Sequence, residues 1–401
     1  MSHQWLNENV FYRYMSDGIV DSLQTCPVLA KADYEKTIEH FKAVYGYQHP
    51  FWQGVYWSPT GGSTSVNSQS VYFPYDIAEN KKQRQVMSQW LAEKEIGVLD
   101  NCNLIANLFT GTKLYRSLEL VNDLASLANV TALPIGSNCT NAEIDKFVQE
   151  FQPDMLAGPP VTLADYANFC LSNGLVRNCI KRIWYATNAL YPAQLNKINL
   201  AFNSPEIYSL YGSAETGPWA YHNAKYLSEN EFIIADDICQ VEIINLNHDG
   251  FGDVLVSNKI RQRFPVIRYS LGDVGRVTRR QIAGEHYHVL ELKGRSQRWL
   301  SFGDDQIELN RIDALLTHYV DWQVIQSFKT NSSVEQIHFN LLAHDISDQQ
   351  IIDLQQRLEK LLNIAEYKQA VEVSLACVSL DEMIKSPLSQ KVIKLVDYRQ
   401  A

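Results

Sequence analysis

The chain has 401 residues, a length typical of roughly two to three domains. Apolar residues make up 46% and charged residues 20% of the chain, which excludes a disordered, collagen-like or coiled-coil protein. The formal net charge is -10, from 35 Lys and Arg against 45 Asp and Glu. A net negative chain argues against a nucleic-acid-binding protein, which needs stripes of basic residues.

The sequence also predicts a protein of the cytoplasm that does not enter a membrane. It has no apolar run of about 18 or more residues, so we expect no transmembrane helix. The N-terminal stretch, Met1 to Val10, is polar and lacks the apolar segment of a signal peptide. The seven cysteines are odd in number and have no CxxC spacing. We therefore expect reduced, mostly buried thiols and no zinc site.

From about Leu91 to Leu210 the sequence alternates short apolar runs with helical periods. The clearest helix begins at Thr140, an N-cap whose partner Glu143 completes a capping box, and it ends before Pro153. Strands are expected within 94–107 and over 154–157, 182–186 and 207–210, and helices over 140–151, 161–173 and 192–202. This βαβα order predicts a parallel sheet with helices on its faces.

From about Glu231 the pattern changes to short strands separated by turns. Strands are expected over 240–246, 252–257, 266–270, 275–278 and 287–292, with a turn at 247–250. After Gly294, helices are expected over 310–318 and 347–362 and strands over 322–328, 334–343 and 371–378. We therefore predict an α/β protein in which residues 1–295 combine mostly parallel sheets, flanking helices and a β-rich subdomain, while residues 296–401 form a small α+β domain.

The first candidate site is the segment Ser58 to Ser65, which is rich in glycine and hydroxyl groups. Two glycines allow a tight turn that brings several N–H groups to one point, and the hydroxyls add further donors. This is the chemistry that a polyphosphate needs, although no GK[ST] follows, so the segment is not a Walker A loop. The alternative is an ordinary turn. The residues concerned are Thr60, Gly61, Gly62, Ser63 and Thr64.

Two further candidates follow predicted strands. The segment Tyr211 to Pro218 lies at a strand end, where ligands of α/β sheets bind. Its tyrosine ring could stack on a base, and the carboxylate of Glu215 could hold Mg²⁺ that bridges phosphates. In the segment Arg268 to Asp273, the aspartate could accept both hydroxyls of a ribose. The alternatives are a tight turn with an exposed glutamate and an ordinary Gly-Asp turn.

The last two candidates are Lys293 to Ser296, at the predicted domain boundary, and Ser386 to Lys391, near the C-terminus. A lysine in the second segment could reach a phosphate as a compact positive charge. Lysines in polar tails are usually only solvated, so this segment by itself leaves both readings open.

Taken in order, the five segments resemble the motifs of the adenylate-forming superfamily, which includes acyl-coenzyme A synthetases, peptide-synthetase adenylation domains and luciferase. That family has a [ST]-G-[ST]-T-G phosphate loop, then YGxTE, RYxxGD, a GR hinge and a C-terminal SGK lysine. The similarity is to the short phenylacetate–coenzyme A ligase branch. The chain length, residues 25–33, Leu108-Phe109-Thr110-Gly111 and Phe264-Pro265-Val266-Ile267-Arg268-Tyr269 look like segments of that branch.

The resemblance implies a role for each motif residue. Residues 60 to 64 would cradle the β- and γ-phosphates of ATP, and Asn188, Tyr211 and Gly212 would line the adenine site. Asp273, helped by Arg295, would hold the ribose hydroxyls.

The remaining roles concern the reaction itself. The resemblance implies that Glu215 binds Mg²⁺, that Thr216 contacts the α-phosphate and that Lys391 bridges the carboxylate and α-phosphate oxygens. The implied reaction joins a small carboxylic acid to AMP. A mobile C-terminal domain then lets the thiol of coenzyme A, or of a phosphopantetheine arm on an acyl carrier protein, attack the acyl-adenylate.

The sequence departs from the family pattern at three places. Ser65 stands where the family usually has glycine, Gln297-Arg298 replaces the usual acidic pair after the hinge, and Gln390 replaces the glycine before the lysine. Each change could slow the domain movement or the chemistry, but none removes a charged group that adenylation needs. A non-catalytic nucleotide or acid sensor is therefore the alternative of another class.

The acid and its acceptor stay open. Several aromatic residues are candidates for the acyl pocket and would suit an aryl acid, although aromatics at such places are as often plain core. They are Trp57, Phe109, Trp184, Tyr185 and Trp219, together with Tyr211. The acceptor could be coenzyme A, a carrier protein or an amine. The resemblance also suggests a homodimer.

Overall fold

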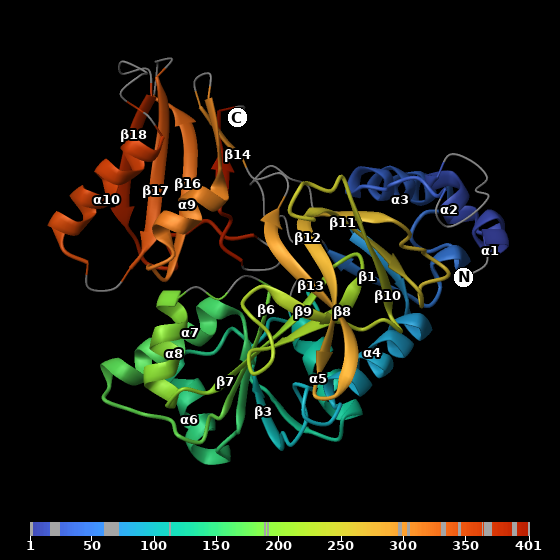
Figure 1. The fold of residues 1–401 in the computed structure, drawn as a ribbon, viewed down its shortest axis with the longest axis horizontal. Helices are drawn as coiled ribbons and strands as arrows, with labels where there is room; N and C mark the ends of the chain where they lie inside the picture. Colours follow the sequence, from blue (N-terminus) through green and yellow to red (C-terminus); the bar gives the residue numbers. More distant parts are fainter. Residues whose placement is uncertain are drawn as a thin grey trace.

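The structure consists of one large sheet with helices on both faces and a smaller sheet built by the C-terminal part of the chain (Figure 1). It is a computed structural model. It describes residues 3–16, 25–59, 72–111, 114–187, 190, 192–295, 299–302, 305–329, 334–343, 346–362, 364, 371–386 and 391–399.

The large sheet has 11 strands in the order β10-β11-β12-β13-β9-β8-β7-β6-β5-β3-β4. Its strands are β3 (Leu104–Asn107), β4 (Thr131–Pro134), β5 (Met155–Gly158), β6 (Arg182–Ala186), β7 (Glu206–Ser213), β8 (Gly217–Asn223), β9 (Glu231–Ile234), β10 (Cys239–Ile244), β11 (Gly252–Asn258), β12 (Tyr269–Ile282) and β13 (Glu285–Arg295). From β4 to β7 the neighbours are parallel, and from β7 to β10 they are antiparallel. The parallel strands and the β-rich region predicted from the sequence therefore form a single sheet.

The two faces of the parallel half are covered by different helices (Figure 1). One core cluster combines apolar residues of α6 (Asn141–Phe151), α7 (Pro160–Ser172) and α8 (Pro192–Phe202) with Ile183 of β6. The other combines residues of α4 (Ile77–Leu91) and α5 (Ser117–Leu127) with Trp184 of the same strand. Neighbouring residues of a strand point to opposite faces, so a strand buried on both faces reads as a continuous apolar run.

The N-terminal part forms a third cluster beside the antiparallel half. It contains α1 (His3–Glu8), α2 (Val10–Met15), α3 (Lys31–Tyr45), the 3₁₀ helix η1 (Pro50–Trp52) and the hairpin β1 (Val55–Pro59) with β2 (Tyr72–Asp76). The Tyr34 hydroxyl donates to the carbonyl of Pro265 at 2.6 Å, so α3 is tied to the segment that leads into β12. Because α3 and the β1–β2 hairpin belong to the same cluster, the hairpin is held near β12, the strand that carries Asp273.

The smaller sheet has the order β18-β17-β16-β19 and a core of its own. Its elements are β16 (Asp321–Phe328), β17 (Glu335–Leu342), β18 (Val371–Cys377) and β19 (Leu395–Asp397), with α9 (Leu309–Leu316) and α10 (Asp348–Leu361), and the hairpin β14 (Trp299–Phe302) and β15 (Asp305–Glu308) precedes them. In Figure 1 this orange and red unit lies beside α7 and α8.

The predicted α/β class is confirmed, and several elements have the predicted bounds. Strand β6 and helix α8 match, and Thr140 caps α6 in the predicted capping box with Glu143. The two strands expected over 266–270 and 275–278 are instead one strand, β12. Its register with β13 shifts between Val274 and Gly275, which marks an irregularity inside the strand.

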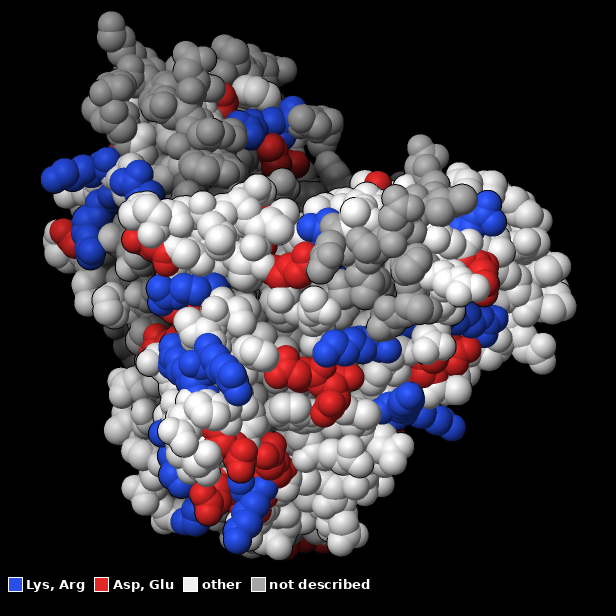
Figure 2. All heavy atoms as spheres, turned by 45° about the vertical axis from the view of Figure 1, so that its right-hand side comes forward, with Lys and Arg blue, Asp and Glu red and all other residues white. Residues whose placement is uncertain are grey.

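Three further observations concern the surface charge, the helices and the cysteines. On the face that Figure 2 shows, Lys and Arg side chains alternate with Asp and Glu side chains. None of the helices in the described part of the chain is long and apolar enough to cross a membrane. All seven cysteines are free, and Cys26, Cys102, Cys170 and Cys239 are buried, as expected from the sequence.

Asp145 gives a test of the helical layer, because it joins α6 to α7 and to the chain that follows. It accepts two hydrogen bonds from Arg177 at 2.7 Å and one from Tyr166 at 2.9 Å. Burial by itself raises the pKa of Asp145, but the hydrogen bonds, led by those from Arg177, outweigh burial and hold the pKa below its ordinary 3.8. The carboxylate therefore stabilises the fold above about pH 4 and loses this effect as the pH falls through the lowered folded-state pKa.

We expect Asp145→Asn to lower the free energy of unfolding by about 3 kcal/mol at pH 7, because it leaves the Arg177 charge without its partner. The difference from the wild type should shrink as the pH falls below about 4, since the carboxylate of the unfolded wild type then takes up a proton before that of the folded protein does. Urea unfolding at pH 7 and pH 3.5 measures both effects, and Asp249→Asn, at a half-exposed turn, is the control. A pH-independent difference would contradict the assignment.

Candidate functional site

The candidate residues lie at one edge of the large sheet. Strands β3, β5, β6 and β7 are parallel, so their carboxyl ends meet at the same edge. Phe109 follows β3, Thr187 follows β6, and the turn that holds Glu215 follows β7. This edge is where α/β sheets bind ligands, because the loops there can vary while the strands hold them in place.

The turn between β7 and β8 is organised around the buried hydroxyl of Thr216. This hydroxyl accepts from the backbone N–H of Ser213 and from the indole of Trp219, both at 3.1 Å, and it donates to the carbonyl of Gly217 at 3.0 Å. A Cβ on Gly212 would collide with the carbonyl of Gly217, so the close approach of the two strands requires glycine there. The turn that carries Glu215 is thus built from its own side chains.

A second layer of side chains holds this turn from behind. Gln83 of α4 donates to the carbonyls of Thr216 at 2.8 Å and Pro218 at 3.0 Å, and Asn258 of β11 donates to the same Thr216 carbonyl at 3.0 Å. Arg261 donates to the carbonyl of Glu215 and packs its guanidinium over a tyrosine ring. Burial lowers the pKa of Arg261 from its ordinary value. The backbone of the turn is therefore fixed by two distant segments, α4 and the end of β11 with the residues that follow it.

Glu215 is 8% exposed, yet its carboxylate has neither a hydrogen bond nor an ion pair with any residue that the structure describes. A divalent cation such as Mg²⁺ could bind this carboxylate, because it takes oxygen ligands and keeps several waters and substrate phosphates. Within the described residues, no group of three or more His, Cys, Asp or Glu gathers as a metal site.

Tyr211 and Asp273 are brought together although they lie 62 residues apart. The Tyr211 hydroxyl donates to the Asp273 carboxylate at 2.6 Å. Their strands, β7 and β12, are four positions apart in the sheet, which in a flat sheet is a distance of roughly 19 Å. The antiparallel half must therefore curve back over the parallel half. Arg295 pairs with Asp273 in the β12–β13 ladder, so its backbone lies at the same place.

Lys391 reaches the same sheet edge from the smaller sheet. Its ammonium group donates to the carbonyl of Thr187, the residue after β6, at 3.1 Å. Thr187 has a φ of 87°, a conformation that β-branched residues rarely adopt. Strained backbone of this kind collects at functional sites, where the surrounding structure holds it in place. The lysine therefore contacts the residue that directly precedes Asn188 in the sequence.

Some predicted residues lie outside the part of the chain that the structure describes. They are Thr60, Gly61, Gly62, Ser63, Thr64 and Asn188, and also the departures at Ser65, Gln297, Arg298 and Gln390. The described strands β1 and β2 flank residues 60–71, with Pro59 paired to Tyr72. The structure thus gives the two anchors of the predicted phosphate loop.

The predicted pocket aromatics do not gather in one place. Phe109, Trp184 and Trp219 are at most 2% exposed and belong to the core cluster on the α4–α5 face. Tyr185 packs on the opposite face with α6 to α8, and Trp57 contacts Trp52 in the N-terminal cluster, with ring centroids 4.9 Å apart. In the structure these residues are largely packing residues, with Trp219 also bonded to the Thr216 hydroxyl.

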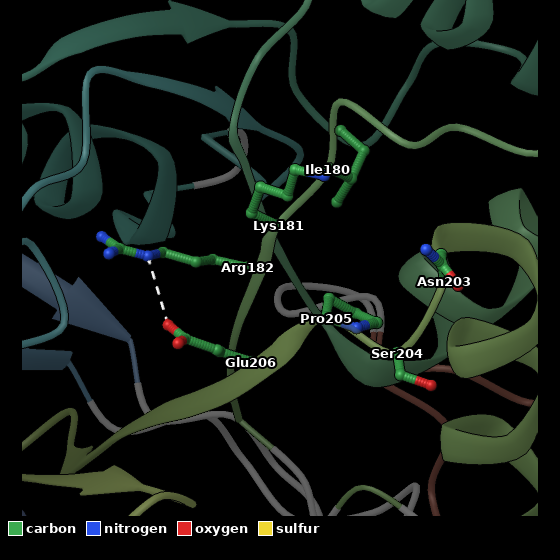
Figure 3. Close-up of a pocket in the computed structure, with 7 residues that line it drawn as sticks. All are labelled: Ile180, Lys181, Arg182, Asn203, Ser204, Pro205 and Glu206. Atoms are coloured by element: carbon green, nitrogen blue, oxygen red, sulfur yellow. Dashed lines mark ion pairs between the residues drawn. The ribbon is translucent and has the colours of Figure 1, made fainter.

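Two hollows in the described surface lie away from these residues. One, of about 300 Å³, lies where β6 and β7 begin, at the opposite edge of the sheet (Figure 3). In it the Arg182 guanidinium faces the Glu206 carboxylate, with 3.5 Å between nitrogen and oxygen. The other, of about 430 Å³, lies beside α5 and β4. Neither hollow is lined by a predicted site residue.

Sequence reasoning missed the residues that support the turn, namely Gln83, Asn258 and Arg261. Each of them lies far along the chain from Glu215, at separations that no motif spans. A weak signal existed at Arg261, which lies just before the Phe264–Tyr269 segment. Because its charge resembles that of any surface arginine in the sequence, only the fold shows that it is buried.

Comparison by sequence found no relative: no protein-family model matches the chain, and no curated protein matches it. Comparison of structures gave clear matches. A 2-hydroxyisobutyryl-CoA ligase in the postadenylation state with 2-HIB-AMP has a TM-score of 0.75 over 99% of this chain and 87% of its own, at 16% identity. The anthranilate CoA ligase AuaEII with anthranoyl-AMP has a TM-score of 0.55 over 84% and 65%, at 15% identity. This chain has the fold of the adenylate-forming coenzyme A ligases.

The matches also distinguish two arrangements of that fold. The same 2-hydroxyisobutyryl-CoA ligase in its thioesterification state, with 2-HIB-AMP and CoA, gives a TM-score of 0.61 at the same 16% identity and the same coverage. Because sequence and coverage are equal in the two comparisons, the difference reflects how the parts of the molecule are arranged. The present arrangement is therefore closer to the postadenylation state of that enzyme.

Thr216 offers a direct test of the turn. Thr216→Val keeps the shape of the side chain but removes the acceptor, so the N–H groups of Ser213 and Trp219 lose their partner. We expect the free energy of unfolding to fall by about 2 kcal/mol. Urea unfolding measures the change, with Thr216→Ser as the matched control that keeps the hydroxyl. Equal stability of the valine variant and the wild type would show that the hydroxyl does not organise the turn.

Proposed function

We propose that this protein activates a small carboxylic acid with ATP to an acyl-adenylate and then transfers the acyl group to a thiol, that of coenzyme A in the first instance. The observation that carries the proposal is convergence at one sheet edge. Lys391, the Tyr211–Asp273 pair and the turn that holds Glu215 lie at this edge, within a fold shared with coenzyme A ligases.

The chemistry of adenylation suits these residues. A carboxylate oxygen of the acid attacks the α-phosphorus of ATP, a C–O–P linkage forms, and the bond to the β-phosphate breaks to release pyrophosphate. Both reactants are anions, so the protein must supply positive charge and positioning more than covalent chemistry. Lys391 at Thr187 supplies one such charge beside the end of β6. No activated serine or cysteine is needed.

The remaining motif residues would bind the nucleotide. Asp273 would accept the ribose hydroxyls, and Tyr211 would hold that carboxylate in place through its hydroxyl while its ring borders the adenine. The backbone amides of residues 60–64 would bind the phosphates from the β1–β2 hairpin. Mg²⁺ held by Glu215 would neutralise phosphate charge. Thr216 bonds inside the turn, so a contact to the α-phosphate would require its hydroxyl to change partner.

We infer that the domain boundary lies at residue 296, because the large sheet ends with Arg295 and the next element begins at Trp299. For thioester formation the domain 296–401 would leave its present position, as the two states of 2-hydroxyisobutyryl-CoA ligase suggest. A carrier protein or an amine is the alternative acceptor. An assay that offers coenzyme A beside candidate carriers separates these alternatives.

We also propose a short or aryl acid as substrate, in line with the phenylacetate–coenzyme A ligase branch that the sequence resembles. The two ligases compared above carry 2-HIB-AMP and anthranoyl-AMP. The bulky residues Phe109, Trp184 and Trp219 fill the space on the α4–α5 face beside the strand ends, which leaves less room there for a long chain.

The central test is exchange of radiolabelled pyrophosphate into ATP in the presence of an acid. We expect Lys391→Ala to lower the exchange rate by about 100-fold, because it removes a positive charge that acts where negative charge develops. The matched control is Lys385→Ala, on the facing arm of the same hairpin, where the lysine pairs with an exposed Asp381.

Two results would count against this proposal in different ways. Full exchange by Lys391→Ala would reject the role of the lysine. ATP binding without exchange for any acid would favour a non-catalytic sensor, the alternative that the departures at Ser65, Gln297 and Gln390 support. The mixed charge of the face in Figure 2 gives no support to a nucleic-acid partner.

The substrate class is tested by a thermal-shift screen of acids in the presence of ATP and Mg²⁺. We expect the largest rise in Tm with an aryl or short unsaturated acid, because such acids gain apolar contact and ring packing without needing a long channel. Long-chain fatty acids serve as the comparison. A panel in which only the long-chain acids raise Tm would contradict this assignment.

A further inference from the structure

The contact between the two domains is built on the connection from β6 to α8. Among the described residues, two side-chain hydrogen bonds cross between the domains, one at each end of this connection. Lys391 donates to the Thr187 carbonyl at 3.1 Å, and Gln194, in the first turn of α8, donates to the Val320 carbonyl at 2.8 Å. Gln194 is only 1% exposed. The predicted adenine residue Asn188 lies between these two contacts in the sequence.

Val320 belongs to the structure that carries Lys391. It forms a small apolar cluster with Leu342, Met383 and Val392, the last of which follows Lys391 directly. Lys391 lies on one arm of a hairpin. The backbone N–H of Ser386 donates to the carbonyl of Lys391 at 2.8 Å, and the backbones of Lys385 and Val392 form an antiparallel β-bridge. A contact to Val320 therefore affects the position of the hairpin that carries Lys391.

The hairpin that carries Lys391 is rigid because the polar groups that hold it are buried and hydrogen-bonded. Gln323, fully buried, donates to the carbonyls of Ile384 at 2.8 Å and Ile393 at 2.7 Å and accepts from the N–H of Ile384 at 3.1 Å. It thus holds both arms of the hairpin. The buried pair of Lys394 and Asp321 adds a charged contact beside it. A displacement at Val320 is therefore passed to Lys391 rather than absorbed between them.

From this geometry we propose that Gln194 is a positioning residue for the adenylation step. Its side-chain amide holds Val320 and, through the hairpin, keeps the Lys391 ammonium at the end of β6. The bond spans 126 residues and joins the two domains. An intramolecular hydrogen bond makes a modest net contribution relative to bonds with water, so it favours this arrangement over those in which the amide is hydrated. The inference rests on the proposed function.

The test uses the full chain and the acid that gives the fastest pyrophosphate exchange. We expect Gln194→Ala to slow exchange roughly fivefold, the loss of one neutral hydrogen bond, with the KM for ATP unchanged. The rate at which coenzyme A consumes the preformed acyl-adenylate should not fall. Asn196→Ala, an exposed residue of the same helix, is the matched control and should behave as wild type.

A second variant, Q194E, separates positioning from general stability. An ionised carboxylate cannot donate to the Val320 carbonyl, whereas the protonated acid can. Burial raises the pKa of such a carboxyl. The exchange rate of Q194E relative to wild type should therefore be low at pH 8 and rise towards pH 5.5. A loss of packing alone would give a ratio that does not change with pH.

Failure of this inference is distinguishable from failure of the proposed function. If the wild type exchanges pyrophosphate and Gln194→Ala and Q194E exchange it equally well at all pH values, Gln194 has no positioning role. If the wild type exchanges nothing with any acid, the proposed function fails. In that case small-angle X-ray scattering, which needs no substrate, still tests the domain contact through the radius of gyration. We expect a larger radius of gyration for Gln194→Ala than for Asn196→Ala, and equal values would overturn the proposed contact.

Discussion

The buried hydroxyl of Thr216 is the interaction on which the candidate site depends. It lies where the large sheet passes from parallel to antiparallel pairing, between β7 and β8. The hydroxyl joins both ends of the turn, and Gln83 and Asn258 hold the backbone of the same residue from two other segments. Since Tyr211 precedes this turn and Glu215 lies within it, the positions of both follow from one well-satisfied buried group.

Charge is distributed around this turn in a way that suits an anionic ligand with a cation. The Glu215 carboxylate is buried without a protein counter-charge among the described residues, while the neighbouring Arg261 is bound through the backbone of the turn and not through that carboxylate. In the proposed function this carboxylate would bind Mg²⁺. On the other side, Lys391 of the C-terminal part brings a positive charge to Thr187, and in the proposed function the site would be complete only while this contact is made.

That dependence connects structure and catalysis. The reaction proposed here has two steps with different needs, because adenylation needs the lysine at the sheet edge and thiol attack needs an open path to the adenylate. A contact made of a few hydrogen bonds is strong enough to favour one arrangement and weak enough to be exchanged for another. The similarity to the postadenylation state of 2-hydroxyisobutyryl-CoA ligase agrees with the first of these arrangements.

The sequence by itself determined local elements such as strand β6 and the capped helix α6, because apolar periods and caps act over a few neighbouring residues. It also singled out Tyr211, Asp273 and Lys391 as candidates, and the structure shows that Tyr211 contacts Asp273 and that Lys391 contacts Thr187. Only the tertiary structure decided that the two halves share one curved sheet, that Trp184 and Trp219 are core, and that Gln194 meets Val320. The physical reason is that such contacts depend on sheet curvature and packing between segments that are far apart in the chain, and neither leaves a local pattern of residues.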